Sequence, residues 1–220
     1  MKKIEELKFY SKREELANTL SHSAGILLGV TAGFILLRES ILNQSIWAVS
    51  SVLLYLFGML GSYITSVLYH AHTHNKRKEQ LRKFDHAAIY FHIAGTYAPF
   101  SLITLREVGV WGWSLFSFVY AAAIVGTFMS FRKLKRHSNL ETFCFVAMGA
   151  TILIAIKPLY DTLLASGSLS ALYWLIAGGA LYIIGALFYS WTKRQYMHFV
   201  FHLFVLAGSF CHIIAIYQIL

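Results

Sequence analysis

The distribution of apolar residues most strongly constrains what this 220-residue chain can fold into. Hydrophobic residues make up 57% of the chain and charged residues only 13%, roughly half the charged share of a typical soluble domain. A water-soluble globule of this size could not bury so much apolar surface, which excludes an ordinary soluble enzyme. Seven apolar segments have the length that a bilayer crossing requires, about 17–25 residues each. They lie near residues 20–37, 46–69, 86–105, 112–131, 140–156, 168–190 and 197–218.

The apolar segments are predicted to be helices, because backbone polar groups in lipid must be hydrogen-bonded within the segment. The predicted fold class is therefore all-α, a seven-transmembrane helical bundle. We expect residues 1–220 to form a single integral membrane domain with a polar N-terminal arm at about 1–18. No connection between the segments is long enough for a globular domain. Any chemistry must then use residues of the bundle itself.

Basic residues alternate between the connections. Sixteen of the 19 Lys and Arg residues lie in the N-terminal arm and in the second, fourth and sixth connections, whereas Arg38, Arg106 and Lys157 lie on the other side. Because Lys and Arg accumulate on the cytoplasmic side of short loops, we expect a cytoplasmic N-terminus and an external C-terminus in a multi-pass protein of the cell membrane. The net charge of +9 occurs in short tracts rather than on one face, which argues against a nucleic-acid partner.

Histidines stand out because ionisable residues within membrane helices are rare and are candidates for function. His198 and His202 are four residues apart and share one face of the seventh helix. His70 ends the second helix, and the predicted topology places it at the same cytoplasmic depth. Three imidazoles and an open fourth position form the ligand set of a catalytic zinc site. Taken alone, the paired histidines fit two hydrogen-bonded core residues equally well.

Asp85 begins the third helix at the same predicted depth, and Ser66 lies one turn before His70 on the same face. The Asp85 carboxylate can bind the metal, or it can hold a metal-bound water and take its proton. The alternative is an acid at a helix N-terminus, stabilised by the helix dipole and by Lys83. Beside three histidines at matching depth, the functional role is favoured.

Glu15, Asn18 and His22 follow at helical spacing on one face where the first helix begins. They can orient a metal ligand from outside its coordination sphere. They can equally be a helix cap followed by interhelical hydrogen bonds. His92 and His212 lie about 10 Å and about 15 Å deeper than the predicted centre, so we expect hydrogen-bonded core residues there.

Four segments carry a resemblance to a known family: Glu15-Leu-Ala-Asn18-Thr-Leu-Ser-His22, Ser66-Val-Leu-Tyr-His70, Phe84-Asp85-His86 and His198-Phe-Val-Phe-His202. In order and spacing they resemble the hemolysin III family, the bacterial branch of the progestin and adipoQ receptor group, which is related to the alkaline ceramidases. The resemblance covers nearly the whole chain and implies a bacterial plasma membrane. It also implies zinc held by His70, His198 and His202, with Asp85 near the zinc-bound water and Ser66 beside the reacting carbonyl.

The expected function is zinc-dependent hydrolysis of an amide or ester bond in a lipid, at the cytoplasmic end of the bundle. A membrane lipid is then the partner, as substrate or ligand. One alternative is a receptor-like sensor of the membrane state, in which zinc is structural and Asp85 is its fourth ligand. Another is a cytolytic or pore-forming hemolysin. Imidazole ligands suit several divalent ions besides zinc.

Overall fold

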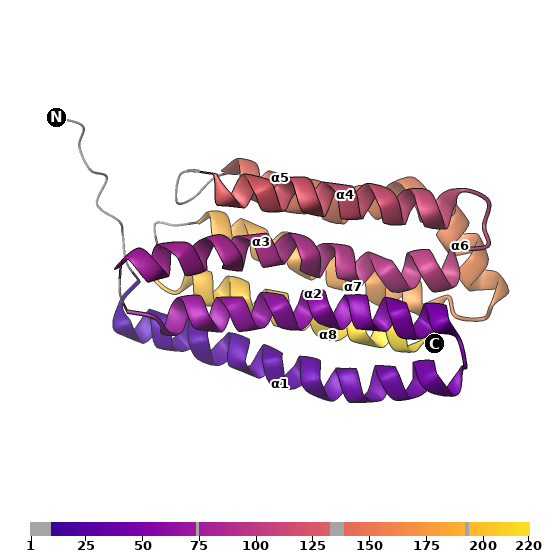
Figure 1. The fold of residues 1–220 in the computed structure, drawn as a ribbon, viewed down its shortest axis with the longest axis horizontal. Helices are drawn as coiled ribbons and strands as arrows, with labels where there is room; N and C mark the ends of the chain where they lie inside the picture. Colours follow the sequence, from indigo (N-terminus) through magenta and orange to yellow (C-terminus); the bar gives the residue numbers. More distant parts are fainter. Residues whose placement is uncertain (1–9, 74, 133–138, 192–193) are drawn as a thin grey trace.

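The computed structural model describes residues 10–73, 75–132, 139–191 and 194–220. The first nine residues of the predicted polar arm lie outside these ranges, as do two loop histidines, His74 and His137. The described residues form helices joined by short turns, and the predicted all-helical membrane bundle is confirmed. The helices run side by side along the long axis of the molecule (Figure 1). They are α1 (Lys12–Leu42), α2 (Ile46–Ala71), α3 (Asn75–Pro99), η1 (Phe100–Thr104), α4 (Trp111–Phe131), α5 (Asn139–Ala150), η2 (Thr151–Ala155), α6 (Ile156–Ala165), α7 (Ser170–Ser190) and α8 (Met197–Tyr217).

Within the described ranges, six helical stretches are long and apolar enough to cross a membrane. Five of these are the single helices α1, α2, α4, α7 and α8. The sixth is the continuous stretch Leu140–Ala165, which runs through α5, η2 and α6. The seventh crossing is α3, which packs against α2 and α4 but begins with a basic tract that lowers its mean hydropathy. Neighbouring helices follow the order α1, α2, α3, α4, α5, α7 and α8, and α8 packs against α1. The crossings therefore form a closed ring.

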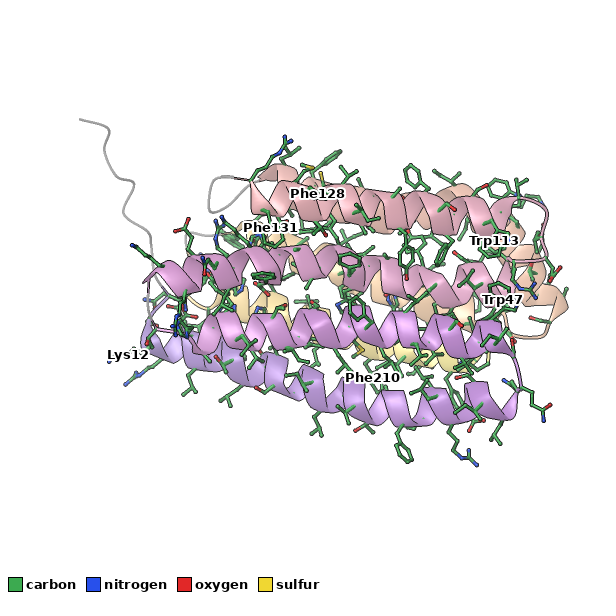
Figure 2. The ribbon with its side chains drawn as sticks, viewed as in Figure 1. Lys12, Trp47, Trp113, Phe128, Phe131 and Phe210 are labelled. Carbon is green, nitrogen blue, oxygen red and sulfur yellow. The ribbon has the colours of Figure 1, made fainter. Side chains whose placement is uncertain are left out.

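Apolar side chains cover the outer surface of the ring, and buried polar side chains lie inside it beside an apolar core. Phe34, Phe128 and Leu187 are 81%, 68% and 68% exposed, as expected for surfaces that face lipid (Figure 2). Ser66 and His70 are almost completely buried instead. Backbones approach closely where glycine permits it: a methyl group added at Gly58 of α2 would collide with the backbone of α3.

Two helices change their winding within the bundle. Pro99 ends the α-helical part of α3, and the chain continues as the π-helical turn η1, in which the Leu105 amide donates to the Phe100 carbonyl. Proline lacks the amide hydrogen that a regular helix needs at this point. Between α5 and α6 the 3-10 turn η2 continues the crossing. Both irregular turns lie beside the interior cavity described below.

Candidate metal centre

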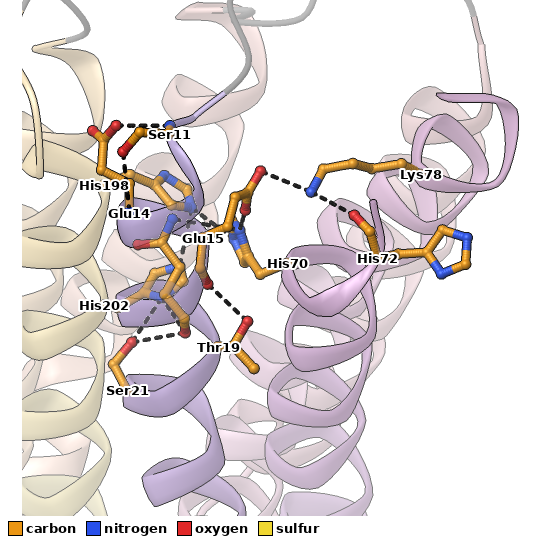
Figure 3. Close-up of polar contacts among 11 residues, drawn as sticks. Ser11, Glu14, Glu15, Thr19, Ser21, His70, His72, Lys78, His198 and His202 are labelled. Atoms are coloured by element: carbon orange, nitrogen blue, oxygen red, sulfur yellow. Dashed lines mark hydrogen bonds and ion pairs between the residues drawn. The ribbon is translucent and has the colours of Figure 1, made fainter. Parts of the chain in front are cut away.

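Three imidazoles converge at the end of the bundle where α1 begins. His70 comes from the last turn of α2, and His198 and His202 come from the first turns of α8 (Figure 3). The Nε2 atom of His198 lies 3.1 Å from Nε2 of His70 and 3.0 Å from Nε2 of His202. One ring nitrogen from each residue lies within 4.8 Å of the other two. The expectation that these three residues meet at one depth agrees with the structure.

Glu15 fixes the proton of His70. Oε2 of Glu15 lies 2.7 Å from Nδ1 of His70. A carboxylate only accepts hydrogen bonds, so Nδ1 carries the proton and donates it. In the neutral imidazole the lone pair of His70 is then on Nε2, the atom that faces His198. Metal-binding histidines in proteins are commonly oriented by a carboxylate in this way.

Asn18 and Ser21 fix the proton of His202. Ser21 Oγ donates to the Asn18 carbonyl at 2.9 Å, so the same hydroxyl accepts from His202 Nδ1 at 3.1 Å. The Asn18 carbonyl itself lies 3.3 Å from that nitrogen and accepts as well. His202 Nε2 therefore also has its lone pair directed at His198.

This pattern of protons fits a bound cation. His70 and His202 both present proton-free nitrogens to His198, and one proton on His198 Nε2 can serve only one of them. Tetrahedral zinc with nitrogen ligands at about 2.0–2.1 Å would hold these nitrogens about 3.3 Å apart. The separations of 3.1 and 3.0 Å are close to that value. The group is able to hold a metal ion.

Contacts from α1 fix where α8 begins. Glu14 closes a capping box with Ser11, the residue before α1, and its Oε1 accepts from the backbone amide of Tyr196 at 2.9 Å. Tyr196 is the residue before α8 and has a positive φ of 62°, which is uncommon for a residue other than glycine. His198 follows two residues later, so Glu14 helps to place a member of the cluster.

The outer side of the cluster is closed by charge and by an aromatic ring. Lys78 Nζ lies 2.7 Å from Oε1 of Glu15 and donates to the carbonyl of His72 at 2.9 Å. The Tyr10 ring stacks on the His198 ring with centroids 5.0 Å apart. Both contacts separate the imidazoles from solvent.

A cavity of about 380 Å³ opens on the inner side of the cluster. His198 and His202 line its end, together with Asp85 and Ser66. Ser66 is 1% exposed and lies beside Asp85. Asp85 is outside the group of mutually close ligand atoms found in the described part of the chain. A tetrahedral ion held by the three histidines alone would have one further coordination position.

His22 occupies the wall between the cluster and the deeper cavity. Its ring stacks on His202 with centroids 3.5 Å apart and an angle of 14°. Within the described ranges neither of its ring nitrogens has a hydrogen-bond partner, although the residue is only 5% exposed. His22 therefore packs against the cluster without belonging to it.

Some contributors to the cluster were not singled out from the sequence. Ser21 lies three residues after Asn18 on the same helix face, and that spacing was a usable signal. Lys78 lies within a basic tract and Tyr10 within a polar arm, so nothing distinguished them from their neighbours. Ser11 and Glu14 cap α1, whereas Glu15 and Asn18 make interhelical hydrogen bonds to His70 and His202.

The fold and the cluster define a multi-pass membrane protein of seven helices with a buried three-histidine group. A family model described as Haemolysin-III related matches residues 10–213, and the chain belongs to this family. Hemolysin-3 of Bacillus cereus is 39% identical over 197 residues, which cover 90% of this chain and 87% of that protein. The Hemolysin-3 homolog of Bacillus subtilis (strain 168) is 38% identical, with 91% of each chain covered. The human monocyte to macrophage differentiation factor is 26% identical over 215 residues, 94% of this chain and 84% of its own.

Proposed function

We propose that the protein is a zinc-dependent hydrolase of an amide or ester bond in a lipid. The observation that carries the proposal is a convergence of proton-free ring nitrogens beside a cavity that Asp85 and Ser66 line. Three protein ligands with an open position are typical of catalytic rather than structural zinc. The apolar interior that continues from the centre suits an acyl chain.

Each residue then has a defined part. Bound zinc would supply a Lewis acid that polarises the substrate carbonyl and acidifies a coordinated water. Asp85 takes a proton as the water oxygen bonds to the carbonyl carbon, and returns it to the departing nitrogen or oxygen as that bond breaks. The Ser66 hydroxyl donates to the carbonyl oxygen as it becomes negative. His70 and His202 keep their orientation because their Nδ1 protons are already bound.

The centre is proposed to lie at the cytoplasmic end of the bundle. Lys12 lies at the same end as the histidines, opposite Trp47 and Trp113 (Figure 2). Basic residues are concentrated at the connections on the Lys12 side, and such connections stay in the cytoplasm. Arg38 and Arg106 lie at the far end, where basic residues are few.

A lipid substrate can reach the cavity from the bilayer. Leu153 of η2 and Ile176 and Ile183 of α7 line the cavity and are nevertheless 61%, 53% and 48% exposed. The cavity wall between η2 and α7 is therefore also part of the lipid-facing surface. An acyl chain entering there would place its carbonyl near Asp85 at the histidine end.

The test is hydrolysis of acyl-amide and acyl-ester lipids by the purified protein, with and without a metal chelator. We expect the rate to fall by about 10²-fold or more after chelation and to recover when zinc is added. His70→Ala should lose both metal and activity, while His72→Ala, two residues away and outside the cluster, should keep both. Equal rates with and without the chelator would end the proposal.

A second candidate follows from the names of the Bacillus relatives, because a hemolysin lyses membranes. It predicts leakage of dye from liposomes containing the protein. The leakage would persist in His198→Ala, since a lytic action needs no metal centre. Leakage that is absent from wild-type liposomes would remove this candidate.

A further inference from the structure

The cavity does not end at the histidine centre but continues to a second group of polar residues, which we call the deep polar cluster. It consists of Tyr63, His92, Tyr182, Ser209 and His212, of which His92, Tyr182 and His212 line the cavity. His212 lies ten residues beyond His202 on α8, which corresponds to about 15 Å at 1.5 Å per residue. One cavity therefore joins two polar sites that lie far apart.

The hydroxyl of Ser209 contacts three other members of the deep polar cluster. Tyr63 Oη donates to Ser209 Oγ at 2.7 Å, and Tyr182 Oη lies 2.8 Å from the same oxygen. His92 Nε2 lies 3.5 Å from it. The Tyr182 ring also contacts the rings of His92 and His212, with centroids 6.1 and 5.2 Å apart. These contacts join α2, α3, α7 and α8.

His212 is the member whose hydrogen bonding is incomplete. Its Nε2 lies 3.2 Å from the Leu175 carbonyl, which only accepts, so Nε2 carries the proton. Nδ1 is then an acceptor, and it has no partner among the described residues although the side chain is 5% exposed. Buried polar atoms are nearly always paired, so an unpaired one needs an explanation. What this site lacks is a hydrogen-bond donor.

Helix association alone does not account for this arrangement. Hydroxyls and imidazoles that bond across helices hold membrane bundles together, and the contacts of Ser209 fit that role. The free acceptor of His212 contributes nothing to it. His212 is also among the residues that line the cavity, so a molecule that fills the cavity packs against its ring.

We propose that the deep polar cluster binds a hydroxyl group carried about twelve carbons along an acyl chain whose carbonyl lies at the histidine centre. An extended chain advances about 1.25 Å per carbon, from carbon–carbon bonds of about 1.5 Å, so about 15 Å corresponds to about twelve carbons. A hydroxyl donates to His212 Nδ1, whereas a ketone or an ether at the same carbon has no hydrogen to give. The position of the carbonyl rests on the proposed function.

The test is equilibrium binding of radiolabelled fatty acids to the purified, metal-loaded protein in lipid nanodiscs. Four acids are compared: octadecanoic, 12-hydroxyoctadecanoic, 12-oxooctadecanoic and 6-hydroxyoctadecanoic. The 12-hydroxy acid should bind about fivefold to tenfold more tightly than octadecanoic acid, the range that one hydrogen bond of typical strength provides. The 12-oxo and 6-hydroxy acids should show no such gain.

Two variants locate the effect. His212→Phe keeps a ring and removes the acceptor, so it should bind the 12-hydroxy acid no better than octadecanoic acid. Cys211→Ala, the neighbouring residue on α8, should keep the wild-type preference. A wild-type protein that binds all four acids equally, or a preference that survives in His212→Phe, overturns the proposal.

Because binding is measured without turnover, this result is independent of the hydrolase test. If the protein prefers the 12-hydroxy acid but hydrolyses no lipid, the proposed hydroxyl-binding site is supported and the proposed hydrolase activity is rejected. If the protein hydrolyses 12-hydroxyacyl and unsubstituted acyl amides with equal kcat/KM and binds both equally, the hydrolase activity is supported and the hydroxyl-binding site is rejected.

Discussion

The histidine centre and the deep polar cluster are built from similar residues but satisfy them in opposite ways. At the centre, His70 and His202 each have Nδ1 bound, and Nε2 is left facing a third imidazole. In the deep polar cluster, hydroxyls bond to one another around Ser209, and Nδ1 of His212 has no hydrogen-bond partner among the described residues. Both sites line the same cavity.

The difference teaches what each site requires. Several lone pairs that point at one another repel unless a proton or a metal cation lies between them, so such a group is suited to holding a metal ion. A single buried lone pair requires only one hydrogen atom. Residue composition alone does not separate these cases, because histidine occurs in both. The direction of the protons does, and it follows from which acceptors the neighbouring helices supply.

The largest expected effect separates the two sites by metal content. His202→Ala removes one of three ligands, and the purified protein should fall from about one metal ion per chain to background, measured by elemental analysis after dialysis. His212→Ala, on the same helix, should keep its metal. Equal metal content in both variants would contradict the division between the sites.

The next effect concerns catalysis at the centre. Asp85→Asn should keep its metal but lose about 10²- to 10⁴-fold in the rate of lipid hydrolysis, because the amide cannot take a proton from water. Asp161→Asn, in an exposed ion pair with Lys157, is the matched control and should keep the wild-type rate. If Asp85→Asn instead loses metal and melts at a lower temperature, Asp85 is a fourth ligand and the zinc is structural.

A smaller effect on metal affinity is expected from Glu15, which contacts His70 but does not face the proposed metal position. Glu15→Gln replaces the carboxylate that binds His70 Nδ1, and metal affinity should fall about 10- to 100-fold. Competition with a chromophoric chelator measures it. Glu39→Gln, near the other end of α1, provides the comparison and should bind metal as the wild type does. An unchanged affinity in Glu15→Gln would show that the carboxylate does not orient the ligand.

The smallest effect is expected in the deep polar cluster. Tyr63→Phe removes the hydrogen bond to Ser209 and should cost about 1 kcal/mol of stability, a fall of about 2–4 °C in melting temperature. Its metal content should not change, because Tyr63 makes no hydrogen bond to the three histidines. Tyr217→Phe alters a tyrosine that is 49% exposed and should melt like the wild type. Loss of metal in Tyr63→Phe would mean that the two sites are coupled.

Hydropathy and charge predicted the bundle because both report on the bilayer rather than on details of packing. They predicted the ends of helices less well: α1 begins at Lys12 and α3 at Asn75, each well before its apolar segment. Helical hydrogen bonding continues beyond the hydrocarbon layer, which hydropathy does not register. The capping box from Ser11 to Glu14 was readable in the sequence as the start of α1.

Depth along the bundle was predictable for the histidines, but rotation about each helix axis was not. The order of basic connections fixes which helix ends share a side, which was enough to bring His70 to the depth of His202. That both Ser21 and Asn18 meet His202 depends on how α1 packs against α8, which only the assembled bundle shows. The same holds for Tyr63 and Ser209, which come from α2 and α8.

The contact between His70 and His198 spans 128 positions of the chain. During synthesis, a partly inserted chain offers a single imidazole of the trio until its last helix enters the bilayer. Capture of the proposed ion would therefore be confined to the last step of assembly, when its binding energy would add to the stability of the finished bundle. A chain truncated before α8 is accordingly expected to gain no stability from added metal.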